Sequence, residues 1–126
     1  MEENIYIDYI LELYKNPKNF GTLENAQIDV KNTNPLCGDE IELFLSINNN
    51  IVEDVKFNGK GCAISQASAS ILTELIKGKT LEELKSIKSE DLLTALGIKL
   101  TPVRLKCALL SYETLQKGLE NYKNKK

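Results

Sequence analysis

The chain has 126 residues, of which 42% are hydrophobic, and it carries a formal net charge of −2 at pH 7. That length and apolar content predict one globular domain over residues 1–126, rather than a disordered segment or two domains. The mildly acidic charge argues against nucleic-acid binding, because such proteins usually present a basic face. No stretch has the apolar length of a membrane span, and the acidic start at residues 1–4 lacks the basic region of a signal peptide, so we expect no membrane contact.

Apolar periodicity predicts a helix and then three strands in the first half of the chain. Apolar side chains first recur at helical spacing, and the pair Asn16-Pro17 ends that pattern. Strict alternation follows, and a run of asparagines marks the turn of a β-hairpin. The predicted elements are a helix over residues 5–14, a strand around 28–30, a strand over 41–47, a turn at 48–50 and a return strand over 52–57.

Helical spacing returns after Gly61 and continues to the C-terminal end. The predicted elements are a helix over residues 64–76 that stops at Gly78, a short helix begun by a capping box at 80–83, a helix capped by Ser89 that ends before Gly97, and a last helix opened by Pro102. Strands grouped ahead of helices predict an α+β fold, with a three-stranded antiparallel sheet and helices packed on one side in a single domain.

The three cysteines, Cys37, Cys62 and Cys107, are dispersed along a chain that contains no histidine. A zinc-finger knuckle is excluded, because its ligand pairs lie about two to four residues apart. Without histidine, Ser–His catalysis, Cys–His catalysis and a His-ligated zinc are excluded as well. If the fold brings the thiols together, they form a three-thiolate metal site with one coordination position left, which Asp39 would fill. Such soft donors suit zinc, copper(I) or an iron–sulfur cluster alike.

The alternative for each cysteine is the common role of a small buried core residue. The neighbouring residues favour a binding site instead. Gly38 follows the first cysteine and lets the loop fold over a ligand. Cys62 opens a predicted helix, where free N–H groups and the helix dipole stabilise a thiolate. Cys107 lies about a turn and a half into the last predicted helix, and Arg104 and Lys106 beside it would also favour a thiolate.

Four motifs span nearly the whole chain: YKNPKNFG at residues 14–21, NPLCGD at 34–39, GCAISQASAS at 61–70 and PVRLKC at 102–107. In this order they resemble the motifs of the U-type iron–sulfur cluster scaffold family, which comprises IscU, SufU and the amino-terminal domain of NifU. The four together are a far more specific signal than any one of them.

The resemblance implies that Cys37, Cys62 and Cys107 hold a nascent [2Fe-2S] cluster or a zinc ion, with Asp39 as the fourth or the labile ligand. A hard carboxylate is a poorer partner for a cluster iron than a thiolate, so a site with one such ligand can release its cargo. The implied partners are a cysteine desulfurase, which supplies sulfur, and apo iron–sulfur proteins, which receive the cluster.

The chain departs from individual family members in three places. Lys106 stands where IscU-type proteins have histidine, and this residue, Arg104 and the segment around Cys62 resemble SufU. SufU proteins carry an insertion between the second and third cysteines, which this chain lacks, so its length there is IscU-like. The segment LTPVR at 100–104 differs from the Leu-Pro-Pro-Val-Lys segment that a dedicated chaperone reads in IscU, which weakens the expectation of that partnership.

Two functions follow, and the sequence leaves both open. The preferred one is a non-enzymatic scaffold that builds a cluster from iron and sulfur on the four ligands and passes it on. The alternative is a SufU-like sulfurtransferase, in which zinc occupies the same ligands and Cys107 is the candidate acceptor of persulfide sulfur. A structural zinc domain without turnover is a third possibility. An odd number of cysteines fits a reducing cytoplasm, so we expect a cytoplasmic protein, either monomeric or weakly oligomeric.

Overall fold

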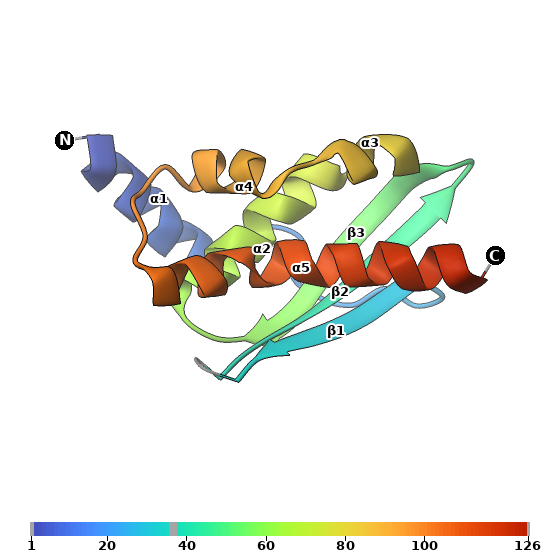
Figure 1. The fold of residues 1–126 in the computed structure, drawn as a ribbon, viewed down its shortest axis with the longest axis horizontal. Coiled ribbons are helices and arrows are strands. Elements are labelled where there is room, and N and C mark those ends of the chain that lie inside the picture. Colours follow the sequence, from blue (N-terminus) through green and yellow to red (C-terminus); the bar gives the residue numbers. More distant parts are fainter. Residues whose placement is uncertain (1, 36–37, 126) are drawn as a thin grey trace.

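The computed structural model describes residues 2–35 and 38–125, which form a three-stranded antiparallel sheet with helices on one side (Figure 1). The predicted α+β class is therefore confirmed. No helix within this part of the chain is both long and apolar enough to cross a membrane. The elements are α1 (Glu2–Lys15), β1 (Ile28–Asn34), β2 (Asp39–Asn48), β3 (Ile51–Lys60), α2 (Ala63–Ile76), α3 (Leu81–Ser86), α4 (Ser89–Leu96) and α5 (Pro102–Lys125).

The strand order is β1-β2-β3, so β3 forms one edge of the sheet. At one end of the sheet Asn34 of β1 pairs with Asp39 of β2, and Glu40 of β2 pairs with Lys60 of β3. The strict alternation of β2 turns Ile41, Leu43 and Leu45 toward the helices, where all three are fully buried. The register therefore sets the first residue of β2 beside the last residues of β1 and β3.

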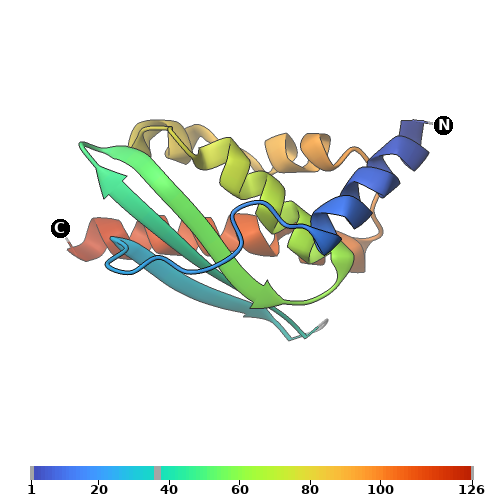
Figure 2. The ribbon, with the colours of Figure 1, turned by 180° about the vertical axis from the view of Figure 1, so that it is seen from behind.

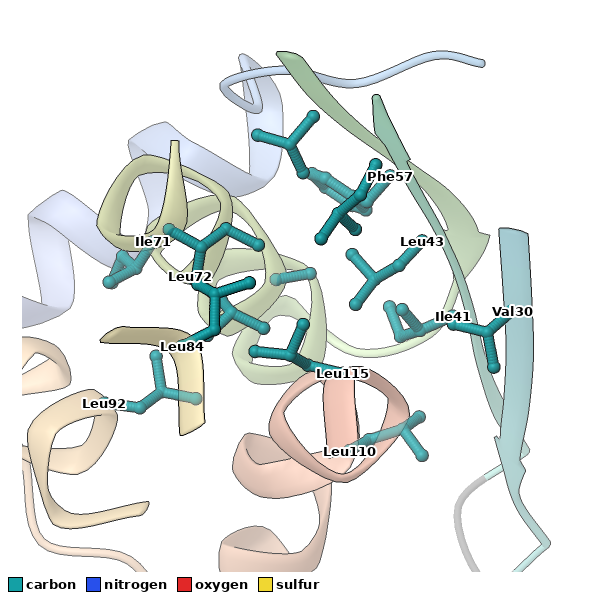
Figure 3. Packing of buried hydrophobic residues seen from close by; sticks show 14 of the residues in the cluster. Val30, Ile41, Leu43, Phe57, Ile71, Leu72, Leu84, Leu92, Leu110 and Leu115 are labelled. Atoms are coloured by element: carbon teal, nitrogen blue, oxygen red, sulfur yellow. The ribbon is translucent and has the colours of Figure 1, made fainter. Parts of the chain in front are cut away.

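Helices α2 and α5 pack on the inner face of the sheet and enclose the hydrophobic core (Figures 1 and 3). Figure 3 shows Leu72 of α2 and Leu115 of α5 lying between the sheet residues Leu43 and Phe57 and the smaller helices. Both α2 and α5 begin near the end of the sheet where β1 turns into β2 and β3 leaves the sheet (Figure 1). Asp39, Cys62 and Cys107, three of the predicted site residues, lie at this common end.

The segment after α1 is fixed to β3 and α2 by hydrogen bonds. The Lys18 main-chain N–H donates to Ser70 Oγ at 2.7 Å, and the Asn19 side-chain amide donates to Thr73 Oγ1 at 3.0 Å. Main-chain hydrogen bonds of 2.9 and 2.8 Å join Phe57 to Asn19 and Gly21. The segment then crosses the sheet toward β1 (Figure 2). The hydrogen bonds of the YKNPKNFG motif thus hold the end of α1 against the edge of the sheet.

The predicted helices are all present, although α1 begins at Glu2 rather than at residue 5. Thr80 and Glu83 form the expected capping box of α3, and the main-chain N–H of Thr80 lowers the pKa of the Glu83 carboxyl by donating to it. Gly97 ends α4 in the left-handed conformation, with φ of 73°. The prediction that Ser89 caps α4 is wrong: Lys88 is the N-cap, because the Asp91 carboxylate reaches back and accepts its main-chain N–H at 2.9 Å.

Candidate metal centre

Asp39, Cys62 and Cys107 converge at the common end of the sheet and helices. The ligand atoms of these three residues all lie within 4.8 Å of one another. They come from three elements, since Asp39 is the first residue of β2, Cys62 is the N-cap of α2 and Cys107 lies in the second turn of α5. Asp39 is 1% exposed and Cys107 2% exposed, whereas Cys62 is partly exposed. Two thiols and one carboxylate thus lie within reach of one ion, and the Cys62 side of the group is partly exposed.

The two oxygens of the Asp39 carboxylate have different surroundings. Oδ1 accepts the main-chain N–H of Cys62 at 3.1 Å, which ties the start of β2 to the start of α2. Oδ2 is buried and has no hydrogen-bond partner among residues 2–35 and 38–125. A buried carboxylate oxygen without a partner loses its hydration and gains nothing in return. A cation held by the Asp39 carboxylate and the two sulfurs would supply an interaction for this buried group, so the described donors fit a metal.

Cys62 lies at a helix start that has no side-chain cap among the described residues. The first N–H groups of α2 and the helix dipole therefore act on the cysteine and favour negative charge at this position. Ser65 Oγ donates to the main-chain carbonyl of Cys62 at 3.0 Å and helps to fix the turn. Thiolate ligands carry negative charge, so the helix start suits a soft metal such as zinc or iron.

Gly61 leaves the space that the carboxylate occupies. A Cβ atom at this position would collide with the Asp39 carboxylate and would lie 2.6 Å from Ser65 Oγ, and the φ angle of Gly61 is +156°. No side chain therefore fits between β3 and the site. The sequence contains Gly61, but only the structure shows that this glycine leaves space for the Asp39 carboxylate.

We expect Gly61→Ala to disrupt the site and to lower the free energy of unfolding by about 2–4 kcal/mol, because the new methyl group must displace the carboxylate and adopt a strained backbone conformation. Denaturant unfolding and zinc titration measure the two effects. Gly78→Ala is the matched control, since it also has a positive φ of +85° but nothing lies within 4 Å of its added Cβ. Equal zinc affinity in Gly61→Ala and Gly78→Ala would contradict the role given to Gly61.

Cys37, the remaining predicted ligand, lies outside the described residues, and its place in the site stays a prediction. The main-chain N–H of Gly38 donates to the Asn34 carbonyl at 2.8 Å, and Gly38 has a φ of +71°.

Arg104 and Lys106, which the sequence placed near Cys107, have exposed side chains. Lys106 lines a hollow of about 310 Å³ with Asn34 and Glu113.

The profile of the NifU-like N-terminal domain matches residues 5–126. The chain belongs to this family. The resemblance drawn from the four motifs is therefore confirmed, and with it membership of the IscU/SufU group of iron–sulfur cluster assembly scaffold proteins.

Individual family members match over almost their whole length. The chain is 40% identical to the zinc-dependent sulfurtransferase SufU of Bacillus subtilis, with 93% of this chain and 90% of that protein covered. It is 34% identical to the iron–sulfur cluster assembly scaffold protein IscU of Escherichia coli K12, with 96% of each chain covered. A crystal structure of a putative SUF-system scaffold protein from Fervidobacterium islandicum superposes with a TM-score of 0.79 at 33% identity, covering 94% of this chain and 99% of that one.

Sequence reasoning missed one residue beside the site. Gln66, on the second turn of α2, is 6% exposed, and its main-chain N–H donates to the Cys62 carbonyl at 3.1 Å. A glutamine in a helix is ordinarily a surface residue, so composition gave no reason to single it out. The local signals are its place in the motif at residues 61–70 and its spacing of one helical turn from Cys62.

Proposed function

We propose that this protein is a scaffold on which an iron–sulfur cluster is assembled for transfer to other proteins. Cys37, Asp39, Cys62 and Cys107 would hold a transient [2Fe-2S] cluster as cargo. A cysteine desulfurase would deliver the sulfur, and apo iron–sulfur proteins would take the finished cluster. Thiolate ligands of such a site require a reducing compartment, for which we propose the cytoplasm.

The observation that carries this proposal is the buried Asp39 carboxylate: its Oδ2 has no partner among the described residues, and one of its oxygens lies within 4.8 Å of the Cys62 and Cys107 sulfurs. A permanent structural site would be expected to use thiolates throughout, because soft sulfur donors bind zinc and iron more firmly than a carboxylate does. One hard carboxylate among soft thiolate ligands lowers the barrier to release of the cluster. Partial exposure of Cys62 leaves the same side of the site open for exchange.

The second candidate is a zinc-dependent sulfurtransferase, and the 40% identity to the SufU protein of Bacillus subtilis favours it. Zinc would be held by the same four residues and would keep their thiolates ionised. Cys107 would then accept sulfur: its thiolate attacks the outer sulfur of the desulfurase persulfide, the S–S bond breaks and the desulfurase cysteine leaves as a thiolate. Because Cys107 is 2% exposed, this route requires the site to open first.

Anaerobic purification followed by metal analysis and an absorption spectrum separates the two candidates. Iron, acid-labile sulfide and visible charge-transfer bands are expected for the scaffold. One zinc per chain with no sulfide is expected for the sulfurtransferase. Protein that binds neither iron nor zinc at equimolar supply would refute both.

We expect Asp39→Ala to retain cluster assembly but to slow cluster release. Three thiolates remain in the proposed site, and the opened position is free for water or an added thiol. The variant also loses the hydrogen bond from Cys62, at a net stability cost of about 1 kcal/mol. Assembly with a desulfurase, iron and cysteine, followed by transfer to an apo-ferredoxin, measures both rates. Transfer as fast as that of the wild type would show that Asp39 is not the labile ligand.

A further inference from the structure

Asn58 is followed directly by Gly59 near the end of β3, the edge strand that leads to Cys62. The main-chain N–H of Gly59 donates to Oδ1 of Asn58 at 2.8 Å. Because a carbonyl bond is about 1.2 Å long, this contact also keeps the side-chain carbonyl carbon of Asn58 within about 4 Å of the Gly59 nitrogen. The two atoms that must join when an asparagine loses its side-chain amide are therefore already close.

The Gly59 nitrogen lies on the open edge of β3. The main chain of Phe57 turns to this edge, where it bonds to Asn19 and Gly21. Because outward and inward groups alternate along an antiparallel strand, the Gly59 N–H turns to the same edge. Its hydrogen-bond partner is a side chain rather than the main chain of β2. Attack by this nitrogen therefore leaves the pairing between β2 and β3 in place.

The Asn58 side chain has room to turn and is accessible to water. It is partly exposed, and it lines a hollow of about 300 Å³ together with Lys31 and Glu42. The side chain can therefore rotate about its Cβ–Cγ bond until the carbonyl carbon, rather than the oxygen, faces the Gly59 nitrogen. Glycine leaves that nitrogen unshielded, and a Cβ placed on Gly59 would collide with the Glu40 carbonyl.

Asn32, on the opposite edge strand β1, makes the same kind of contact with the residue that follows it. Its Oδ1 accepts the main-chain N–H of Thr33 at 3.0 Å, so this hydrogen bond alone does not distinguish the two asparagines. Threonine is branched at Cβ and crowds its own main-chain nitrogen, whereas glycine does not. The combination of a short contact with an unshielded nitrogen therefore distinguishes Asn58 from Asn32.

We propose that Asn58 and Gly59 form a self-modification site, at which spontaneous deamidation produces isoaspartate and weakens the candidate metal centre. The Gly59 nitrogen attacks the side-chain carbonyl carbon of Asn58, and the new C–N bond closes a succinimide ring. The side-chain amide leaves as ammonia, with the proton that the Gly59 nitrogen gives up. Water then opens the ring at either carbonyl and yields aspartate or isoaspartate. Water is the co-reactant, and nothing is oxidised or reduced.

Isoaspartate would disturb the end of β3, because the chain then continues through the side-chain carbonyl and gains one main-chain carbon atom. Gly59 has little freedom to absorb the extra length, since its main chain lies close against that of Glu40. The pairing of Glu40 with Lys60 is therefore expected to loosen. Asp39 precedes Glu40, and Gly61 follows Lys60, so the disturbance reaches the residues that position the Asp39 carboxylate.

The aspartate product would act through charge alone, because it keeps the length of the main chain. Asn58 pairs with Glu42 across the two strands. Hydrogen bonding to Asp29, together with desolvation and the Asp29 charge, already raises the pKa of the Glu42 carboxyl. Another carboxylate directly opposite Glu42 adds repulsion of modest size. The two products of one reaction thus separate the effect of charge from the effect of a longer main chain.

Incubation of the full chain at neutral pH, followed by peptide mapping with mass spectrometry, tests the modification. A synthetic peptide of residues 54–61, incubated in parallel, gives the rate without the fold. We expect Asn58 to gain the mass that corresponds to NH2 replaced by OH, at a rate within about tenfold of the peptide rate. Asn32 is the internal control and should gain none over the same time. A rate at Asn58 more than about tenfold below the peptide rate, or an equal gain at Asn32, would overturn the proposal.

Zinc titration of the aged protein tests the effect on the metal centre. The isoaspartate fraction, separated by chromatography, is expected to bind zinc about tenfold more weakly, the scale of losing a residue that supports a metal ligand. Asn58→Asp carries the added charge without the longer main chain and should lose less than about fivefold. Asn58→Gln is the control for ageing, because its longer side chain closes the ring more slowly, and it should keep its zinc affinity throughout the incubation.

The modification itself does not depend on the proposed function, whereas its effect on zinc does. Equal zinc affinity in modified and unmodified protein would overturn the link to the metal centre. An isoaspartate fraction that has lost its circular dichroism signal would show global unfolding and would overturn the local effect. Wild-type protein that binds neither zinc nor cluster would refute the proposed function and the effect on the metal centre, while the mass gain at Asn58 would still establish the modification.

Discussion

Cys107→Ser is expected to abolish cluster assembly and to weaken zinc binding by more than about a hundredfold. Loss of a residue that only hydrogen-bonds to a metal ligand weakens metal binding by about 10- to 100-fold, and loss of a ligand itself should cost more. A serine hydroxyl is a hard, weakly acidic donor, so it replaces neither the charge nor the softness of a thiolate. The loss falls on a buried atom in the second turn of α5, within 4.8 Å of Cys62 and Asp39, where no other described cysteine can take its place. Cluster absorbance after desulfurase-driven assembly and competition titration with a zinc chelator are the measurements.

Ser111→Ala controls for the effect of altering α5. Ser111 is one turn beyond Cys107 and fully buried, and its Oγ has no hydrogen-bond partner among the residues described here, so its removal costs little. The control should assemble clusters at the wild-type rate with almost unchanged unfolding. Normal assembly by Cys107→Ser would show that the residue is not essential, and the proposed ligand set would be wrong.

Removing bound metal with a chelator is expected to lower Tm by about 15 °C. A metal at a free concentration a thousand times its Kd stabilises the folded state by about 4 kcal/mol, and for a chain of this size each kcal/mol shifts Tm by about 4 °C. The protein should remain folded without metal, because the core between the sheet and helices α2 and α5 does not depend on the site. Thermal unfolding with and without chelator gives the shift.

The loss of order after metal removal should be local. Amide exchange should accelerate at Gly38, Asp39 and Gly61, which surround the site, and stay slow at Leu43 and Val55 in the buried part of the hairpin. Cys107→Ser is the control: because its metal binding is weakened more than about a hundredfold, its Tm should respond to the chelator by less than about 6 °C. Identical Tm and exchange before and after verified metal loss would show that the metal contributes nothing to folding.

Local signals in the sequence predicted the elements well. The alternation in β2, the capping box at Thr80 and Glu83 and the proline at the start of α5 each depend on residues a few positions apart, and each is present as predicted. Where the prediction of α4 was wrong, two local signals competed. The Asp91 carboxylate, rather than the Ser89 hydroxyl, satisfied the free N–H at the start of that helix.

The full length of β1 could not be predicted from local signals in the sequence. The polar residues Asn32, Thr33 and Asn34 have weak strand patterning, yet they continue the strand because β2 provides a paired partner for each of them. That extension carries β1 to Asn34, opposite Asp39, and so sets the edge of the candidate site. Strand propensity depends on the neighbouring strand, which is not adjacent in sequence.

By itself, the sequence determined the order of the elements, the family motifs and the residue types that suit a soft metal. The tertiary structure alone decided that Asp39, Cys62 and Cys107 meet, because their approach requires the pairing of Glu40 with Lys60 and the packing of α5 beside α2. It also decided that Gln66 is buried beside them. Periodicity and caps arise between close neighbours in the chain, whereas a site built from distant segments depends on the long-range contacts that fold them together.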